Sequence, residues 1–166
     1  MNNVSEVVRA YTAGILDGEG SVQLNPSKSK TNGKKYWCLT VQVSSGDTEL
    51  LEWLKVTWGI GNVGVYKPKG SVNFRVNGCW RCYSKEATIL LKAVLPYLRI
   101  KKKHAETALE FKEKCSPRME KNSGRAKQLT PELIARRREL AIELAMLNAK
   151  SGKTVVKYPE RYLEVN

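Results

Sequence analysis

Apolar side chains recur every three or four residues near the N-terminus of the chain, which predicts a helix. Glycine readily accepts the left-handed conformation that ends many helices, so we expect this helix to end at Gly18. Glu19 would then lie just beyond the helix end. The predicted apolar stripe consists of Val4, Val7, Val8, Tyr11 and Ile15.

A second stripe on the same helix is made of small residues, Ala10, Ala13 and Gly14. Small side chains at this spacing let the backbone of another helix approach closely. The helix therefore has a face suited to packing against a second helix.

Strict alternation of apolar and polar residues follows the helix, over residues 21–30 and again over 36–45. Alternation with a period of two predicts strands with one apolar and one polar face. Asn32-Gly33 between them is a strong turn signal, so the two strands should form a hairpin. The apolar face is expected to contain Val22, Leu24, Leu39, Val41 and Val43.

The pattern then repeats with another helix and another hairpin. Asp47 can cap a helix that ends near Gly59, because an aspartate side chain accepts hydrogen bonds from free N–H groups of the first turn. Residues 63–65 and 72–77 should pair across a turn at 67–70.

Helices are expected in the remainder of the chain. Ser84 is a plausible cap for one that Pro96 interrupts, and a further helix should follow it. Residues 116–129 have the composition of a basic loop. Thr130 followed by Pro131 predicts the start of a long last helix. Its buried side should contain Leu133, Leu140, Leu144 and Leu147.

Composition changes the picture through charge, since 29 Lys and Arg residues against 16 acids give a formal charge of +13. Such an excess suits a polyanion, with nucleic acid as the first candidate and an anionic membrane surface as the second. We find no basic amphipathic helix with bulky anchors, no apolar run of about 18 residues and no signal peptide. We therefore expect a soluble, intracellular protein.

The cysteines include one C-x-x-C pair, Cys79 and Cys82, for which Cys38, Cys115 and His104 are the scattered possible partners in a zinc site. A structural zinc site usually has a second pair at similar spacing. We favour ordinary reduced cysteines on a strand.

The segment from Thr12 to Ser21, TAGILDGEGS, resembles the signature of the LAGLIDADG homing endonucleases. The predicted order of helix, hairpin, helix, hairpin and helix is the αββαββα order of that family. The resemblance implies an α+β fold whose antiparallel sheet forms a DNA-binding saddle, with additional C-terminal helices. We expect residues 1–115 to form the endonuclease core and 116–166 to complete the same domain.

In that family the motif helix packs against a second copy of itself. Because the motif occurs once here, the resemblance implies a homodimer, and two-fold symmetry would bring two Glu19 side chains together. The expected interface contains Ala10, Ala13, Gly14 and Asp17, where Asp17 also has a structural role at the helix end.

The resemblance also implies a catalytic site. By position, Glu19 is the acid that binds a divalent metal, Mg²⁺ or another cation such as Mn²⁺, with the Gly18 carbonyl beside it. Lys101 matches a lysine next to the active site of single-motif members. Ser45 stands where many relatives have a glutamine that organises water, and Glu49 where they often have a basic residue.

The polar strand faces could read DNA, because a two-stranded ribbon fits the major groove and Gln, Asn, Arg and Lys pair base edges there. The candidates for base contacts are Gln23, Asn25, Ser27, Tyr36, Thr40, Gln42, Lys67, Lys69, Asn73, Arg75 and Asn77. The candidates for phosphate contacts are Lys28, Lys30, Lys34, Lys35, Lys102 and Lys103.

The sequence thus favours a homing endonuclease that makes a double-strand break in a long, pseudo-palindromic DNA site, encoded within an intron or intein. The departure at Ser45 keeps a binding-only relative open, either an intron RNA maturase, whose partner would be RNA, or a DNA-binding regulator. A basic RNA-packing protein would explain the charge but not the helix face that ends in Glu19.

Overall fold

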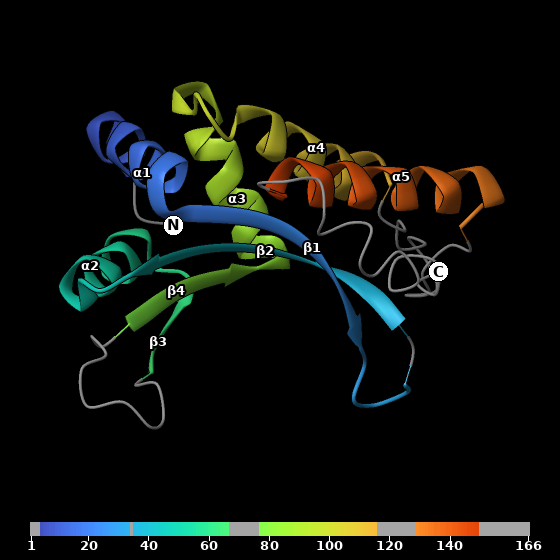
Figure 1. The fold of residues 1–166 in the computed structure, drawn as a ribbon, viewed down its shortest axis with the longest axis horizontal. Coiled ribbons are helices and arrows are strands. Elements are labelled where there is room, and N and C mark those ends of the chain that lie inside the picture. The colour runs from blue at the N-terminus through green and yellow to red at the C-terminus, as the bar shows by residue number, and fades with distance from the viewer. Residues whose placement is uncertain (1–3, 34, 67–76, 116–128, 150–166) are drawn as a thin grey trace, which may run out of the picture.

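A curved antiparallel sheet lies against a layer of helices in the computed structural model, which describes residues 4–33, 35–66, 77–115 and 129–149 (Figure 1). The elements follow the order αββαββα and continue with further helices, as predicted. They are α1 (Glu6–Glu19), β1 (Gly20–Lys28), β2 (Lys35–Ser45), α2 (Thr48–Trp58), β3 (Asn62–Tyr66), β4 (Asn77–Tyr83), α3 (Ser84–Val94), a 3₁₀ turn (Leu95–Tyr97), α4 (Lys102–Lys114) and α5 (Pro131–Asn148).

The four strands are arranged in the order β1-β2-β4-β3, and all neighbours are antiparallel. Gly20 pairs with Val43 at one end of the first hairpin, and Lys28 pairs with Lys35 at the other. The sheet arches so that its concave face points away from the helices (Figure 1).

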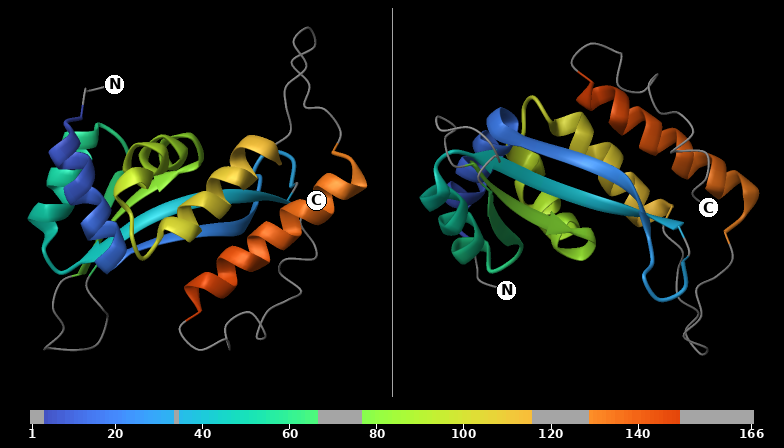
Figure 2. Two further views of the ribbon diagram at one scale, coloured as in Figure 1. Left: turned by 90° about the horizontal axis from the view of Figure 1, so that it is seen from above. Right: turned by 60° about the horizontal axis from the view of Figure 1, so that its bottom comes forward.

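The apolar residues predicted for the first hairpin form the centre of the core. Val22, Leu24, Leu39, Val41 and Val43 are all buried on the face that the helices cover. Helix α5 packs against α4 and β1 on that side (Figure 2). The opposite face has no described helix over it, which is the usual arrangement of an antiparallel sheet with one solvated side.

Helix α1 ends later than predicted, after Glu19 rather than at Gly18. Gly20 is the cap residue, and its N–H donates to the Leu16 carbonyl. An added Cβ at Gly20 would lie 2.6 Å from that carbonyl oxygen, whereas one at Gly18 would meet nothing within 4 Å. The terminating glycine is therefore the one that allows a close backbone approach.

The apolar stripe expected on α1 is also wrong in part. Val7 and Tyr11 are 77% and 55% exposed, and the buried side of the helix is Thr12, Ala13 and Leu16. The Thr12 hydroxyl accepts a buried hydrogen bond from the Trp58 indole N–H at 3.0 Å, which ties α1 to α2. On the buried side of α1, the Thr12 hydroxyl thus makes a polar contact where an apolar one was expected.

Two predicted helix caps are confirmed and one is wrong. Asp47 accepts from the Leu50 N–H at 3.0 Å, and Thr130 accepts from the Leu133 N–H at 3.3 Å. Ser84 is instead the first residue of α3. The helix interruption expected at Pro96 is confirmed as the 3₁₀ turn.

Helix α5 buries Leu140 and Leu144 as expected, but Leu147 is 37% exposed. Arg137 is buried instead, with its guanidinium carbon 5.2 Å from the centre of the Phe111 ring. The long apolar part of an arginine and the ring face together explain how this position can be covered.

Cys79 and Cys82 are buried, free cysteines on β4, where alternation directs them to opposite faces. Within the described ranges, no three His, Cys, Asp or Glu side chains are grouped to hold a metal ion. The prediction that these two cysteines lie on a strand is confirmed. Across the same residues, no helix has the length and apolarity needed to cross a membrane.

Candidate functional site

An open pocket of about 410 Å³ lies where the end of α1, the start of α4 and the end of α5 meet. Glu19 and Lys101, which are far apart in sequence, line the same cavity. The lining residues are Gly18, Glu19, Gly20, Ser21, Ile100, Lys101, His104, Leu147 and Asn148.

Asp17 fixes the loop that delivers Lys101 to this pocket. Its carboxylate accepts from the backbone N–H groups of Arg99 and Lys101, both at 2.8 Å. Burial raises the pKa of Asp17, but the N–H groups of Arg99, Lys101 and Ile100 and the Lys101 charge outweigh it, so the net shift is downward. Asp17 thus has the structural role expected for it at the helix end, and its predicted place in a dimer interface stays a prediction.

The side chain of Lys101 is held as firmly as its backbone. Its Nζ donates to the Asp17 carbonyl oxygen at 2.6 Å. This carbonyl belongs to the last turn of α1, where the negative end of the helix dipole favours a cation. The ammonium group is therefore fixed beside the end of α1.

The two lysines that follow Lys101 are exposed, as their expected phosphate role requires. The Nζ of Lys103 lies 3.2 Å from Glu143 Oε1 on α5, where the lysine side chain is 63% exposed and the glutamate side chain 36%. Such an exposed pair contributes little to stability, so a phosphate could replace the carboxylate at small cost.

Ser45 is not among the residues that line this pocket, and its catalytic role stays a prediction. Its hydroxyl accepts from the Asp47 N–H at 3.0 Å in the turn that leads into α2. Glu49 is exposed in the first turn of α2, where an acid suits the helix N-terminus. Neither residue takes part in the cavity around Glu19.

Two pocket residues, His104 and Asn148, were not predicted. Burial lowers the pKa of His104, and no hydrogen-bond partner for its buried Nδ1 is found within the described part of the chain. Asn148 donates from Nδ2 to the carbonyls of Val22 and Leu144, at 2.7 and 2.8 Å. Asn148 thus anchors the end of α5 to β1, a contact that no local sequence signal indicates.

The bare face of the sheet collects most of the predicted base-contact residues that the structure describes. Along β1, Asn25 Nδ2 donates to Gln23 Oε1 at 3.0 Å, and Gln23 Nε2 donates to Ser21 Oγ at 3.2 Å. Thr40 is only 7% exposed on the central strand, which corrects its expected role as an accessible contact. The others on this face are Ser27, Tyr36 and Gln42, with Asn77 at the start of β4.

The phosphate-contact lysines of the first hairpin, Lys28, Lys30 and Lys35, are exposed. The predictions for Lys34, Lys67, Lys69, Asn73 and Arg75 lie outside the described residues.

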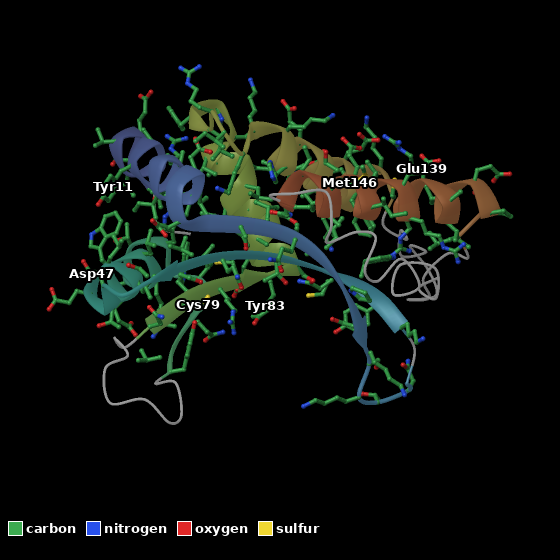
Figure 3. The ribbon with its side chains drawn as sticks, viewed as in Figure 1. Tyr11, Asp47, Cys79, Tyr83, Glu139 and Met146 are labelled. Atoms are coloured by element: carbon green, nitrogen blue, oxygen red, sulfur yellow. The ribbon has the colours of Figure 1, made fainter. Side chains whose placement is uncertain are left out.

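Residues of β3 and β4 that the sequence analysis missed complete this face. The register pairs Arg81 with both Gln42 and Asn62, and Tyr83 with Thr40. Figure 3 shows Tyr83 on the side of the sheet away from the helices, and Arg81 shares its parity along β4. The alternation of Cys79, Arg81 and Tyr83 was the available signal, but the predicted strand of the second hairpin ended at residue 77.

One face of α1 has no described element packed against it. Val7, Ala10 and Gly14 are exposed there, and an added Cβ at Gly14 would meet nothing within 4 Å. Tyr11 is also exposed, but its ring packs edge-on against Trp53 of α2, with 5.5 Å between the ring centroids. Of the expected small residues, Ala10 and Gly14 thus lie on this face. Ala13 is fully buried in the core of its own chain, so its predicted place in an interface is wrong.

Comparisons with known proteins identify the family and the fold. The sequence model described as LAGLIDADG endonuclease matches residues 12–115, which is more than half of the chain. No curated protein matches the sequence.

Solved structures share the fold at low sequence identity. The homing endonuclease I-CvuI, in complex with its target in the presence of calcium, is 17% identical with a TM-score of 0.64, over 96% of this chain and 97% of that chain. The archaeal intron-encoded homing endonuclease I-Vdi141I, complexed with DNA, is 17% identical with a TM-score of 0.64. The match covers 95% of this chain and 97% of that chain. The LAGLIDADG meganuclease I-AabMI, bound to uncleaved DNA, is 22% identical with a TM-score of 0.57. The match covers 92% of this chain but only 49% of that chain.

Proposed function

Because the chain belongs to the LAGLIDADG endonuclease family, we propose that it is a homing endonuclease. It acts as a homodimer that cuts both strands of a long, roughly palindromic DNA duplex with the help of divalent metal ions. The observation that carries this proposal is the pocket in which Glu19 and Lys101 meet, at the edge of a bare polar sheet face.

The free face of α1 supports the homodimer. Ala10 and Gly14 leave room for a second helix backbone, and Val7 and Tyr11 expose apolar surface beside them. The chain matches the full length of I-CvuI but about half of I-AabMI, as expected if two such units work together. A two-fold axis along α1 would place two pockets over one duplex, and symmetry of the target follows from it.

The residues at the end of α1 fit a hard divalent cation. Glu19 offers an exposed carboxylate and Gly18 a carbonyl, and oxygen ligands are those that Mg²⁺ or Mn²⁺ prefers. Mg²⁺ usually keeps several waters and takes one or two carboxylates together with substrate phosphates. When bound, the metal would lower the pKa of a water molecule and stabilise charge on the phosphoryl oxygens.

Other groups of the chain would act around that metal. Lys101 supplies a positive charge at a fixed point, where it can stabilise charge that develops on a scissile phosphate. Asp17 holds both the backbone and the ammonium group of Lys101, so it is a positioning residue. The polar sheet face would lie in the major groove, and the exposed lysines of the hairpin would contact phosphates.

The test substrate is a DNA duplex in which the two sequences that flank the reading frame are joined directly, with the reading frame removed. The protein should cut this duplex with Mg²⁺, and chelation should stop it. Glu19→Gln should keep selective binding and lose cutting, because an amide is a poorer metal ligand than a carboxylate. Normal cutting by Glu19→Gln would refute the metal assignment, and absence of selective binding by the wild-type protein would refute the proposal.

The binding-only alternative has one observation in its favour. The Ser45 hydroxyl accepts from the Asp47 N–H in the turn into α2, and a serine reaches less far than the glutamine that many relatives have at this position. A wild-type protein that binds the joined duplex selectively but never cuts it would favour a DNA-binding regulator. Stimulation of splicing of the host intron RNA would favour a maturase.

A further inference from the structure

We infer that Arg81, held in place by Gln42, reads a guanine in the major groove close to the point of cleavage. The inference rests on the proposed function and assigns one base contact within it. Arg81 is exposed on β4, on the bare face of the sheet. Its Nε donates to Gln42 Oε1 on β2 at 3.2 Å.

The register places this pair in a polar row that crosses all four strands. Ser21 pairs with Gln42, Gln42 with Arg81, and Arg81 with Asn62. Residues paired across antiparallel strands point to the same face. The row therefore presents four polar side chains in a line on the surface proposed to face DNA.

The hydrogen bond decides which base each side chain can read. A glutamine pairs adenine through its amide oxygen and its amide nitrogen together, and the bond from Arg81 Nε to one lone pair of the Gln42 oxygen turns this amide towards Arg81. Arg81 uses only Nε, so both Nη groups are free of this bond. Two parallel N–H donors match the O6 and N7 acceptors of guanine. Gln42 thus orients the arginine, and Arg81 makes the base contact.

The amides on β1 are less available than Arg81. Gln23 accepts from Asn25 and donates to Ser21, so both ends of its amide are engaged within the strand. Breaking these bonds would be needed before Gln23 could pair a base. A guanidinium that is already oriented loses less conformational entropy on binding.

The row also fixes the position of the base relative to the cut. Its first member, Ser21, lines the same pocket as Glu19 and Lys101. Neighbouring strands lie about 4.8 Å apart, so Arg81 is roughly 10 Å from the pocket edge. With the row aligned along the duplex axis, as this inference assumes, 3.4 Å per base pair makes this about three base pairs from the scissile phosphate. The guanine should occur once in each half-site, by symmetry.

The test starts from a library of duplexes with randomised sequence, from which the full-length protein selects its preferred site. Affinities are then measured for that site and for each of its single-base variants. For the wild-type protein, one position near the cut should prefer guanine by roughly 5- to 150-fold, the range of a bidentate contact. Arg81→Ala should abolish that preference and leave the other positions unchanged.

Two further variants separate base reading from charge. Arg81→Lys keeps the charge but lacks the planar fork, so it should lose most of the guanine preference while retaining general affinity. Gln42→Ala should weaken the preference without shifting it to adenine. Arg136→Ala is the matched control, because it removes an exposed arginine on α5, where Glu110 and Glu139 partner it, away from the polar face.

The outcomes distinguish this inference from the proposed function. If Arg81→Ala binds and cuts with an unchanged guanine preference, the inference is wrong and the endonuclease proposal stands. If Gln42→Ala abolishes an adenine preference, Gln42 is the base reader and the inference is again wrong. A wild-type protein that selects no duplex from the library would overturn both.

Discussion

Asp17 holds Lys101 by both ends: its carboxylate accepts from the Lys101 backbone N–H at 2.8 Å, and its carbonyl accepts from the Lys101 Nζ at 2.6 Å. One residue of α1 therefore sets both the path of the chain into α4 and the position of an ammonium group. In the proposed enzyme, these two hydrogen bonds set the distance between Glu19, which binds the metal, and Lys101, which faces the phosphate.

Asp17→Asn should destabilise the fold and slow cleavage more than it weakens DNA binding. An amide can accept only one of the two N–H bonds and places an NH₂ group against the other donor, which costs about 1–3 kcal/mol. Chemical denaturation at neutral pH measures the loss. The cleavage rate and the binding affinity are measured on the same duplex. Equal losses in both would contradict the positioning role of Asp17.

The effect of Asp17→Asn on stability should also depend on pH. The pKa of Asp17 is lowered from 3.8 in the fold, so its stabilisation is fully present above that value and is lost as the pH falls through the lower, folded pKa. The difference in unfolding free energy between the wild-type protein and Asp17→Asn should therefore shrink below about pH 4. A constant difference down to pH 2 would show that ionisation of Asp17 is not involved.

Lys101→Met should slow cleavage by about 100- to 1,000-fold, the usual effect of removing one preorganised electrostatic group from an active site. Binding should change only a few-fold, because Lys101 is tied to Asp17 and is one charge among many. Single-turnover cleavage at saturating protein gives the rate. Lys102→Met is the matched control: it removes an exposed lysine and should weaken binding without changing the saturated rate.

Gly14→Leu should break the homodimer and leave a folded monomer. An added Cβ meets nothing within 4 Å in the single chain, whereas it would separate two helices that pack backbone to backbone. Sedimentation velocity reports the oligomeric state, and an unchanged dimer would remove the α1 face as the interface. Ala13→Leu is the contrasting variant, because it overpacks the core and should cost about 1–3 kcal/mol of folding free energy.

Thr12→Val should destabilise the protein by about 1–3 kcal/mol, although the two side chains have almost the same shape. The buried Trp58 indole N–H would lose its acceptor, and an unpaired buried donor is costly. Urea unfolding followed by tryptophan fluorescence gives the free energy. Thr12→Ser keeps the hydroxyl and should lose less, so equal losses would point to packing instead.

Local patterns predicted much of this fold. Alternation over residues 21–30 and 36–45 identified the buried face of the sheet, because successive side chains of a strand point to opposite faces. The caps at Asp47 and Thr130 were found because each satisfies backbone donors within three residues. Element order followed from these signals, and the family signature then supplied Glu19 and Lys101.

Contacts between distant segments could not be predicted in this way. Gly18 and Gly20 are equivalent in a helix-end pattern, and only the close approach to Leu16 selects Gly20. Ala13 and Gly14 are both small, and only the packing of the whole chain shows which one is buried. Asn148 reaches a carbonyl on β1 across 126 residues of sequence. Arg81 was missed for a different reason, because the predicted strand ended at residue 77 whereas β4 extends from Asn77 to Tyr83.

The alternation of β1, β2 and β4 also bears on how such a protein can change over time. Side chains on the bare face of these strands point away from the buried side chains on the opposite face. They can therefore be exchanged for others while the hydrophobic layer, and with it the fold, stays as it is. A lineage could acquire a new target one position at a time, with each intermediate still folded.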